Sequence, residues 1–163
     1  MITNVSLVAV YCLDQDVARD FYVDVLGFQP RADVTAGEGF RWVTVCHPGH
    51  PELELSLTLP GPPLDAEGAA FVRRQLEQGQ MGGLGLRVDD CRRTYEELKA
   101  KGVTFLQEPA ARPYGVEAVM RDASGNWLVL IEPTEFTPED LTPAADRELS
   151  RVSNIVISDQ DRT

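Results

Sequence analysis

The chain has 163 residues, enough for one domain of ordinary size that is stable without disulfides or a structural metal. Its hydrophobic fraction of 43% and charged fraction of 25% are typical of a soluble globular protein, and no apolar run approaches the ~20 residues of a membrane-spanning helix. The net charge of −11 repels phosphate backbones and anionic membrane surfaces, so we expect neither nucleic acid nor membrane as a partner. Electrostatics favour the binding of a cationic or neutral small molecule over an anionic one.

The cysteines and the N-terminus bear on the cellular compartment. Cys12, Cys46 and Cys91 are widely spaced and lack a CxxC pair, so they indicate neither a disulfide framework nor a zinc site. The chain starts almost at once with a strand-like pattern and lacks the features of a signal peptide. We therefore expect reduced, buried cysteines and a cytoplasmic location.

The first half of the chain has the pattern of a strand, a helix and three further strands. Residues 5–12 are rich in β-branched and apolar types, and the segment DQDVARDFYVDVLGF then changes to helical spacing. Asp14 precedes this helix and Gly27 stands where a left-handed cap ends it, which predicts a helix over 15–26. The three strands are expected at residues 28–34, 40–46 and 53–59.

The second half repeats this order after a break at residues 60–63 and a short connecting helix within 65–79. Its elements are expected as a strand at 84–88, a helix closed by Gly102, and strands at 103–107, 116–121 and 127–131. Asp14 lies thirteen residues before Gly27, and Asp89 lies thirteen before Gly102. The chain therefore contains an internal repeat of about 75 residues.

The repeat predicts an α+β fold of two βαβββ modules that form a cupped mixed β-sheet with the helices outside. Each helix covers one face of its sheet, so the opposite faces must meet each other or a ligand. The expected domain is 1–133, with module one at 1–59, a connector at 60–81 and module two at 82–133. Residues 134–163 form a polar, acidic extension whose apolar run at 155–157 is expected to dock.

Three segments resemble the vicinal oxygen chelate superfamily, which includes glyoxalase I, extradiol dioxygenases, fosfomycin-resistance enzymes and bleomycin-resistance proteins. They are DQDVARDFYVDVLGF, LRVDDCRRTYEELKAKGVTF and PYGVEAVMRDASGNWLVLIEP, of which the last resembles the PxG…DPxGNxxEL element of that superfamily. The resemblance covers residues 1–133 and implies paired βαβββ modules, a small-molecule site and a homodimer.

Superfamily enzymes hold a divalent metal with His, Gln or Glu side chains from four strands, and the metal acts as a Lewis acid or activates oxygen. The resemblance places three of these positions at Leu7, Gly83 and Val129, none of which is a ligand type. Only Glu54 matches, and a single carboxylate does not hold a catalytic metal. We therefore expect no metal cofactor.

Two charged groups leave alternatives open. Glu54 is expected on a strand that faces the cup, either in an internal ion pair with Arg87 or as an anchor for a ligand amine or amide. His47 and His50, with Glu52, form a conceivable metal cluster, although histidines in a proline-constrained turn are usually only solvated.

Aromatic residues from different strands and loops predict a stacking pocket, although each of them has the alternative of filling the core or a dimer interface. Tyr114 is the least core-like, because RPYG is a loop sequence. The expected ligand-binding residues are Tyr11, Trp42, Glu54, Arg87, Tyr114 and Trp127.

The expected function is a non-catalytic protein that sequesters a small, cationic molecule by mass action, similar to the bleomycin-resistance branch and to antibiotic resistance by binding. The alternative is a divalent-metal-dependent lyase, isomerase or dioxygenase with a rearranged metal site. A third hypothesis makes the cup a dimerisation surface in a regulatory or structural protein.

Overall fold

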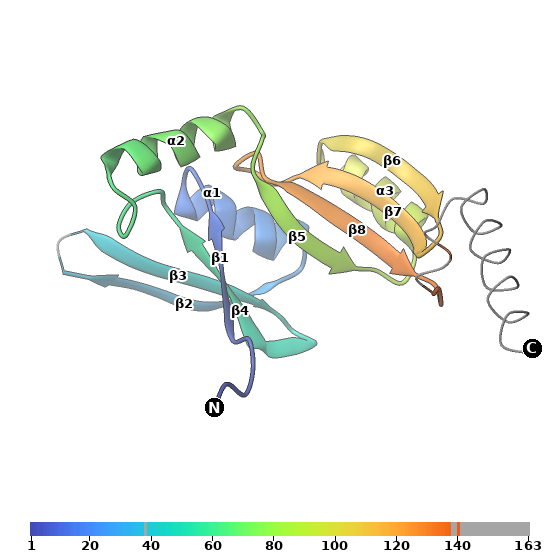
Figure 1. The fold of residues 1–163 in the computed structure, drawn as a ribbon, viewed down its shortest axis with the longest axis horizontal. Helices are drawn as coiled ribbons and strands as arrows, with labels where there is room; N and C mark the ends of the chain where they lie inside the picture. Colours follow the sequence, from blue (N-terminus) through green and yellow to red (C-terminus); the bar gives the residue numbers. More distant parts are fainter. Residues whose placement is uncertain (38, 138–139, 141–163) are drawn as a thin grey trace, which may run out of the picture.

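A computed structural model describes residues 1–37, 39–137 and 140 of the chain, and the apolar run at 155–157 lies outside them. The described chain forms two four-stranded mixed sheets with helices outside, as predicted (Figure 1). The first module contains β1 (Leu7–Tyr11), α1 (Gln15–Asp20), the π-helical turn η1 (Phe21–Val25), β2 (Gln29–Ala36), β3 (Phe40–His47) and β4 (His50–Thr58). After α2 (Ala66–Glu77), the second contains β5 (Gly82–Arg87), α3 (Cys91–Ala100), β6 (Phe105–Arg112), β7 (Gly115–Arg121) and β8 (Trp127–Pro133).

The two sheets have the same topology. Their strand orders are β1-β4-β3-β2 and β5-β8-β7-β6. In each sheet the first strand of the module pairs parallel to the last one, and the other pairs are antiparallel. The repeat deduced from sequence spacing is therefore a repeat of structure.

Side-chain caps start the helices and glycines end them. Asp14 Oδ1 accepts hydrogen bonds from the backbone N–H groups of Asp16 and Val17 at 2.8 and 3.0 Å, and Asp90 Oδ1 accepts one from Arg93 at 2.8 Å. Gly27 and Gly102 have φ angles of +79° and +87°, the left-handed conformation that favours glycine after a helix. The capping residue of the second helix is Asp90 rather than Asp89, so cap and glycine are thirteen residues apart in the first module and twelve in the second.

Several element boundaries differ from the predicted ones. The helix expected over 15–26 changes at Phe21 from α-helical to π-helical bonding. β4 begins at His50 rather than at residue 53, because the chain reverses within two residues after His47. β6 extends to Arg112, so the turn before β7 contains only Pro113 and Tyr114.

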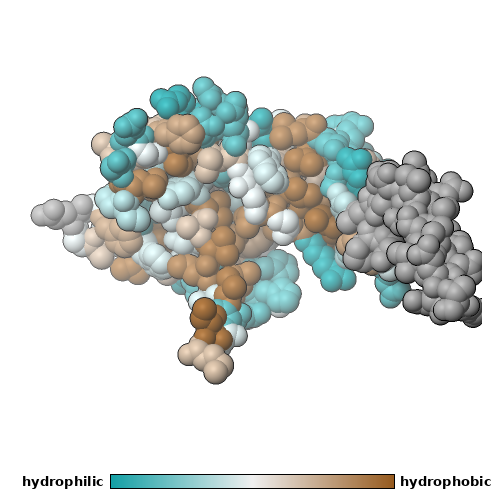
Figure 2. Space-filling model, viewed as in Figure 1, coloured by the Kyte–Doolittle hydropathy of each residue, from teal (hydrophilic) through white to brown (hydrophobic). Residues whose placement is uncertain are grey.

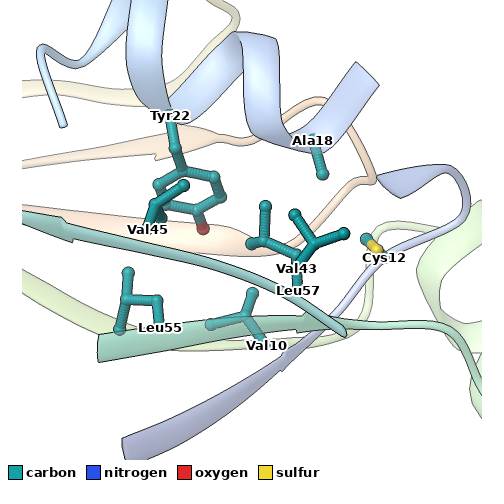
Figure 3. Packing of buried hydrophobic residues seen from close by; sticks show 8 residues of the cluster. All are labelled: Val10, Cys12, Ala18, Tyr22, Val43, Val45, Leu55 and Leu57. Atoms are coloured by element: carbon teal, nitrogen blue, oxygen red, sulfur yellow. The ribbon is translucent and has the colours of Figure 1, made fainter. Parts of the chain in front are cut away.

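The core of the first module lies between α1 and its sheet (Figure 3). Tyr22 is fully buried and points from the helix towards Val45, while Val43 and Leu57 are 1% exposed beneath Ala18. The second module buries Ala118, Met120, Leu128 and Leu130 against α3 in the same way. In the described part of the chain, each sheet therefore has one face covered by its helix and one face without a helix.

The turn between β7 and β8 fastens the second module to the first. Leu13 N donates to Ser124 Oγ at 3.2 Å, and Asn126 Nδ2 donates to the carbonyl oxygen of Tyr11 at 2.8 Å. The hydroxyl of Tyr22 donates to the buried carboxylate of Asp122 at 3.2 Å. The DASGN segment is thus a hairpin turn and also a latch between the modules.

The helix-free faces of the two sheets point in different directions. In Figure 1, α1 lies above the first sheet, whereas α3 lies behind the second. In the same view, hydrophobic side chains gather over β1 and β4 and over β5 and β8 (Figure 2). The single chain thus carries two separate, partly apolar surfaces.

None of the helices in the described part of the chain is both long enough and apolar enough to span a membrane.

Candidate functional site

We name the helix-free face of the first sheet the first cup face. The pairing of the strands places alternate residues on this face, and they comprise Leu7, Ala9, Tyr11, Ala32, Val34, Trp42, Thr44, Cys46, Glu54, Ser56 and Thr58. Trp42 of the inner strand β3 is 36% exposed, and Leu7 at the start of the edge strand β1 is 42% exposed, so this face leaves large apolar side chains uncovered. The three predicted residues Tyr11, Trp42 and Glu54 therefore share one surface.

The carboxylate of Glu54 is held within this face. Thr44 Oγ1 donates to Glu54 Oε2 at 2.6 Å, and Arg31 Nε lies 3.7 Å from Glu54 Oε1. Arg87 makes no contact with Glu54, so the ion pair that the sequence suggested is not formed. That hypothesis was wrong because the two residues lie on different sheets, and the partner of Glu54 comes from β2.

The second cup face is the helix-free face of the second sheet. It comprises Gly82, Gly85, Arg87, Gln107, Arg112, Glu117, Val119, Arg121, Trp127, Val129 and Ile131. Trp127 lies over β5, because a Cβ atom on Gly82 would be 2.1 Å from the indole Nε1. The glycine therefore provides the space that the indole ring occupies.

A polar cluster centred on Glu117 lies beside these residues. Tyr114 donates its hydroxyl to Glu117 Oε2 at 2.6 Å, and Arg112 Nε and Gln107 Nε2 donate to Oε1 at 2.8 and 3.1 Å. The Tyr114 hydrogen bond, with those of Arg112 and Gln107, lowers the pKa of Glu117 below its ordinary value. The same bond raises the pKa of Tyr114, so its hydroxyl keeps its proton.

This cluster was missed by sequence reasoning. The signal was available in the PYGVE segment, because strand alternation from Val119 places Glu117 on the same face as the predicted Trp127. Phe136 also contacts Tyr114, with ring centroids 6.0 Å apart. Tyr114, expected as a loop aromatic, thus stands between Glu117 and Phe136.

The six predicted ligand-binding residues divide evenly between the two faces. Tyr11, Trp42 and Glu54 lie on the first, whereas Arg87 and Trp127 lie on the second and Tyr114 stands at its border. No hydrogen bond, ion pair or ring contact joins one group to the other among the described residues. Within one chain they form two separate groups.

The residues at the superfamily metal positions do not fit a metal ion. Leu7 pairs with Glu54 on the first face, Val129 pairs with Gly85 on the second, and Gly83 has no side chain. Glu54, the one oxygen ligand, lies next to the positive charge of Arg31. In the described ranges, no group of three His, Cys, Asp or Glu side chains comes together as metal ligands.

A large concavity lies elsewhere, between the modules on the helix side of both sheets. It is an open groove of about 1070 Å³ whose lining includes Leu55, Leu84, Leu86 and Leu130. His47 and His50 are at its border, with ring centroids 6.3 Å apart. Of the six predicted residues, only Arg87 lines this groove.

The family profile of the Glyoxalase/Bleomycin resistance protein/Dioxygenase superfamily matches residues 4–130. Together with the two βαβββ modules and their strand order, this match shows that the chain belongs to that superfamily.

Similar proteins are known in sequence and in structure. The crystal structure of UcmS2 is 45% identical, with a TM-score of 0.75, covering 81% of this chain and 99% of UcmS2. TnmS3, described as an antibiotic binding protein from Streptomyces sp. CB03234, is 32% identical with a TM-score of 0.65, covering 82% and 98%. YurT of Bacillus subtilis (strain 168) is 30% identical over 130 residues, covering 79% of this chain and 98% of YurT.

Proposed function

We propose that this protein binds and sequesters a small molecule in an aromatic-lined cup without transforming it. The observation that carries the proposal is the chemistry of the cup faces, where apolar residues and glycine occupy three of the superfamily metal positions and Trp42, Tyr114 and Trp127 lie beside them. The similarity to the antibiotic binding protein TnmS3 supports the same reading. Such binding would protect a cell by lowering the concentration of the free small molecule, through mass action alone.

The complete cup requires a second copy of the chain. One molecule presents the first and second cup faces in different directions, and each leaves large apolar side chains exposed. Packing the first face of one copy opposite the second face of another buries both and encloses the six predicted residues. We therefore propose a homodimer with two equivalent cups. The free, buried cysteines support a location in a reducing compartment such as the cytoplasm.

Measuring metal content and ligand binding together tests whether the protein binds its ligand without a metal-dependent reaction. The purified protein is dialysed against divalent ions, its bound metal is quantified, and aromatic natural products are screened by thermal shift with and without metal. We expect no stoichiometric metal and metal-independent shifts. A tightly held equivalent of metal that is required for binding would support the metal-dependent lyase, isomerase or dioxygenase instead.

Tyr114→Ala tests the location of the site. This change removes an aromatic surface and the hydroxyl that holds Glu117, and we expect ligand affinity to fall about tenfold or more. Tyr114 lies in a two-residue turn at the border of the sheet, so the melting temperature should change by only a few degrees. Unchanged affinity would exclude the cup and direct attention to the groove between the modules.

A further inference from the structure

The charge of the second cup face is opposite to that of the whole chain. The chain carries a net charge of −11, but the charged side chains that the strands place on this face are Arg87, Arg112, Arg121 and Glu117. Three arginines and one glutamate give this face a positive net charge. The charge that bears on a ligand is the local one, because exposed charges farther away than about 10 Å are largely screened at physiological salt.

Glu117 is not available to a ligand cation. Both of its oxygens already accept hydrogen bonds, two from neutral groups of Tyr114 and Gln107 and one from the guanidinium of Arg112. Arg112 therefore neutralises it. Glu54 on the first cup face is similarly engaged, by Thr44 and Arg31. A ligand ammonium would have to displace a partner from one of these carboxylates.

Arg87 differs from the other arginines of this face. Arg121 donates to the carbonyl oxygens of Gly79 and Gly125 at 2.7 and 3.0 Å, which makes it part of the β7–β8 turn. Arg87 is exposed at the end of β5 and forms no hydrogen bond or ion pair with any residue that the structure describes. Its guanidinium offers a fork of donors suited to an oxyanion.

The surroundings of Arg87 match an elongated aromatic ligand. Along β8, Ile131 pairs with Arg87 and Trp127 pairs with Gly82. These two positions are four residues apart, which corresponds to roughly 13 Å along a strand. Between them lie Val129 and Gly85, where a Cβ would have no neighbour closer than 3.9 Å. The face thus has an aromatic end, an open apolar floor and a cationic end.

We propose that the ligand of this cup is an aromatic molecule with an anionic group, a carboxylate, sulfonate or ionised phenol, that Arg87 binds while the rings lie on Val129 and Trp127. The proposal rests on the proposed binding function and specifies its ligand class. It replaces the expectation of a cationic ligand, which was drawn from the net charge of the whole chain.

A matched pair of fluorescent probes tests this ligand class. Anilinonaphthalene sulfonate and phenylnaphthylamine share their ring system, but only the first carries an anionic group. We expect the wild-type protein to bind the sulfonate about tenfold or more tightly than the neutral probe, with a preference that declines as salt is added. Arg87→Gln should remove this preference and leave the affinity for phenylnaphthylamine unchanged.

The control is Arg73→Gln, which removes the same charge from the exposed surface of α2, where Arg73 likewise has no hydrogen bond or ion pair among the described residues. This variant should bind both probes as the wild type does. Trp127→Ala should weaken both probes alike, which identifies the cup as their site.

The possible failures are distinguishable. If the wild type binds both probes equally, or binds the planar cation proflavine more tightly, the anionic ligand class is wrong while the binding function stands. If Arg87→Gln and Arg73→Gln lower sulfonate affinity equally, the effect belongs to net charge and the role of Arg87 is wrong. If no probe binds, the proposed binding function itself fails for aromatic ligands.

Discussion

At the residue scale, the side chain of Asp122 takes part in four hydrogen bonds. It is 7% exposed and accepts hydrogen bonds from the hydroxyl of Tyr22, the backbone N–H groups of Ser124 and Asn126, and the side-chain amide of Asn126. Burial raises the pKa of the Tyr22 hydroxyl, so it remains a donor over the whole accessible pH range. The carboxylate thus joins the latch turn to the core of the other module.

Asp122→Asn should therefore destabilise the protein strongly. The new amide group points a donor at other donors and leaves at least one buried partner unsatisfied, at a cost of about 2–4 kcal/mol. For a chain of this length, we expect the melting temperature to fall by roughly 5–15 °C in calorimetry. Asp24→Asn, at an exposed position of η1, is the matched control and should melt like the wild type.

Glu117 gives the stability a defined dependence on pH. Its pKa is lowered in the folded state, so its contribution is present above its ordinary value of 4.5 and is lost as pH falls through the folded value. Denaturation of wild type and Glu117→Gln should differ most near neutral pH and converge in acid, below that ordinary value. A difference that grows in acid would contradict the assignment.

At the element scale, β5 is shaped by its glycines. Gly82 lies under Trp127, and Gly85 lies on the open floor of the second cup face. In the sequence segment MGGLGL, we interpreted Gly83 as a lost metal position. That interpretation does not address the role of Gly82, which makes room for the indole ring of Trp127. The close approach of the indole to the backbone of β5 became visible only with the strand pairing.

Gly82→Ala should displace Trp127 from β5. A methyl group there would lie 2.1 Å from the ring, and Gly82 lacks the positive φ that would add backbone strain to the substitution. In a Trp42→Phe background, we expect acrylamide to quench the remaining indole more efficiently. Gly85→Ala is the matched control, since its Cβ would meet Ile131 at 3.9 Å, an ordinary contact.

What the sequence could predict depended on local periodicity. Strand alternation correctly placed Trp127 and Val129 on one face and Leu128 and Leu130 on the other. Alternation defines faces within a strand, but it cannot give the relative orientation of two sheets. Glu54 and Arg87 were therefore paired wrongly across modules, and the bonds of Asp122 to the first module were not foreseen.

At the scale of the whole molecule, the proposed cup takes one face from each of two chains. We expect light scattering to report twice the chain mass of 18.0 kDa, because the exposed apolar side chains of both faces become buried in the dimer.

Mixed dimers test the composition of each cup. Trp42→Ala damages the first face and Tyr114→Ala the second, so each variant alone has two damaged cups. Co-expression should produce mixed dimers in which one cup is intact, restoring binding at up to about half of the sites in those dimers. A cup built within a single chain would show no such recovery.

The latch has a consequence for how the chain reaches this structure. The partners of the Tyr11 carbonyl and the Leu13 amide lie at Asn126 and Ser124, 115 and 111 residues further along. When the first module has emerged from the ribosome, the β7–β8 turn that bonds to it has not yet been synthesised. We expect the nascent chain to reach full protection from proteolysis only after residue 126 has emerged, so that two sheets with separate cores unfold as one cooperative unit.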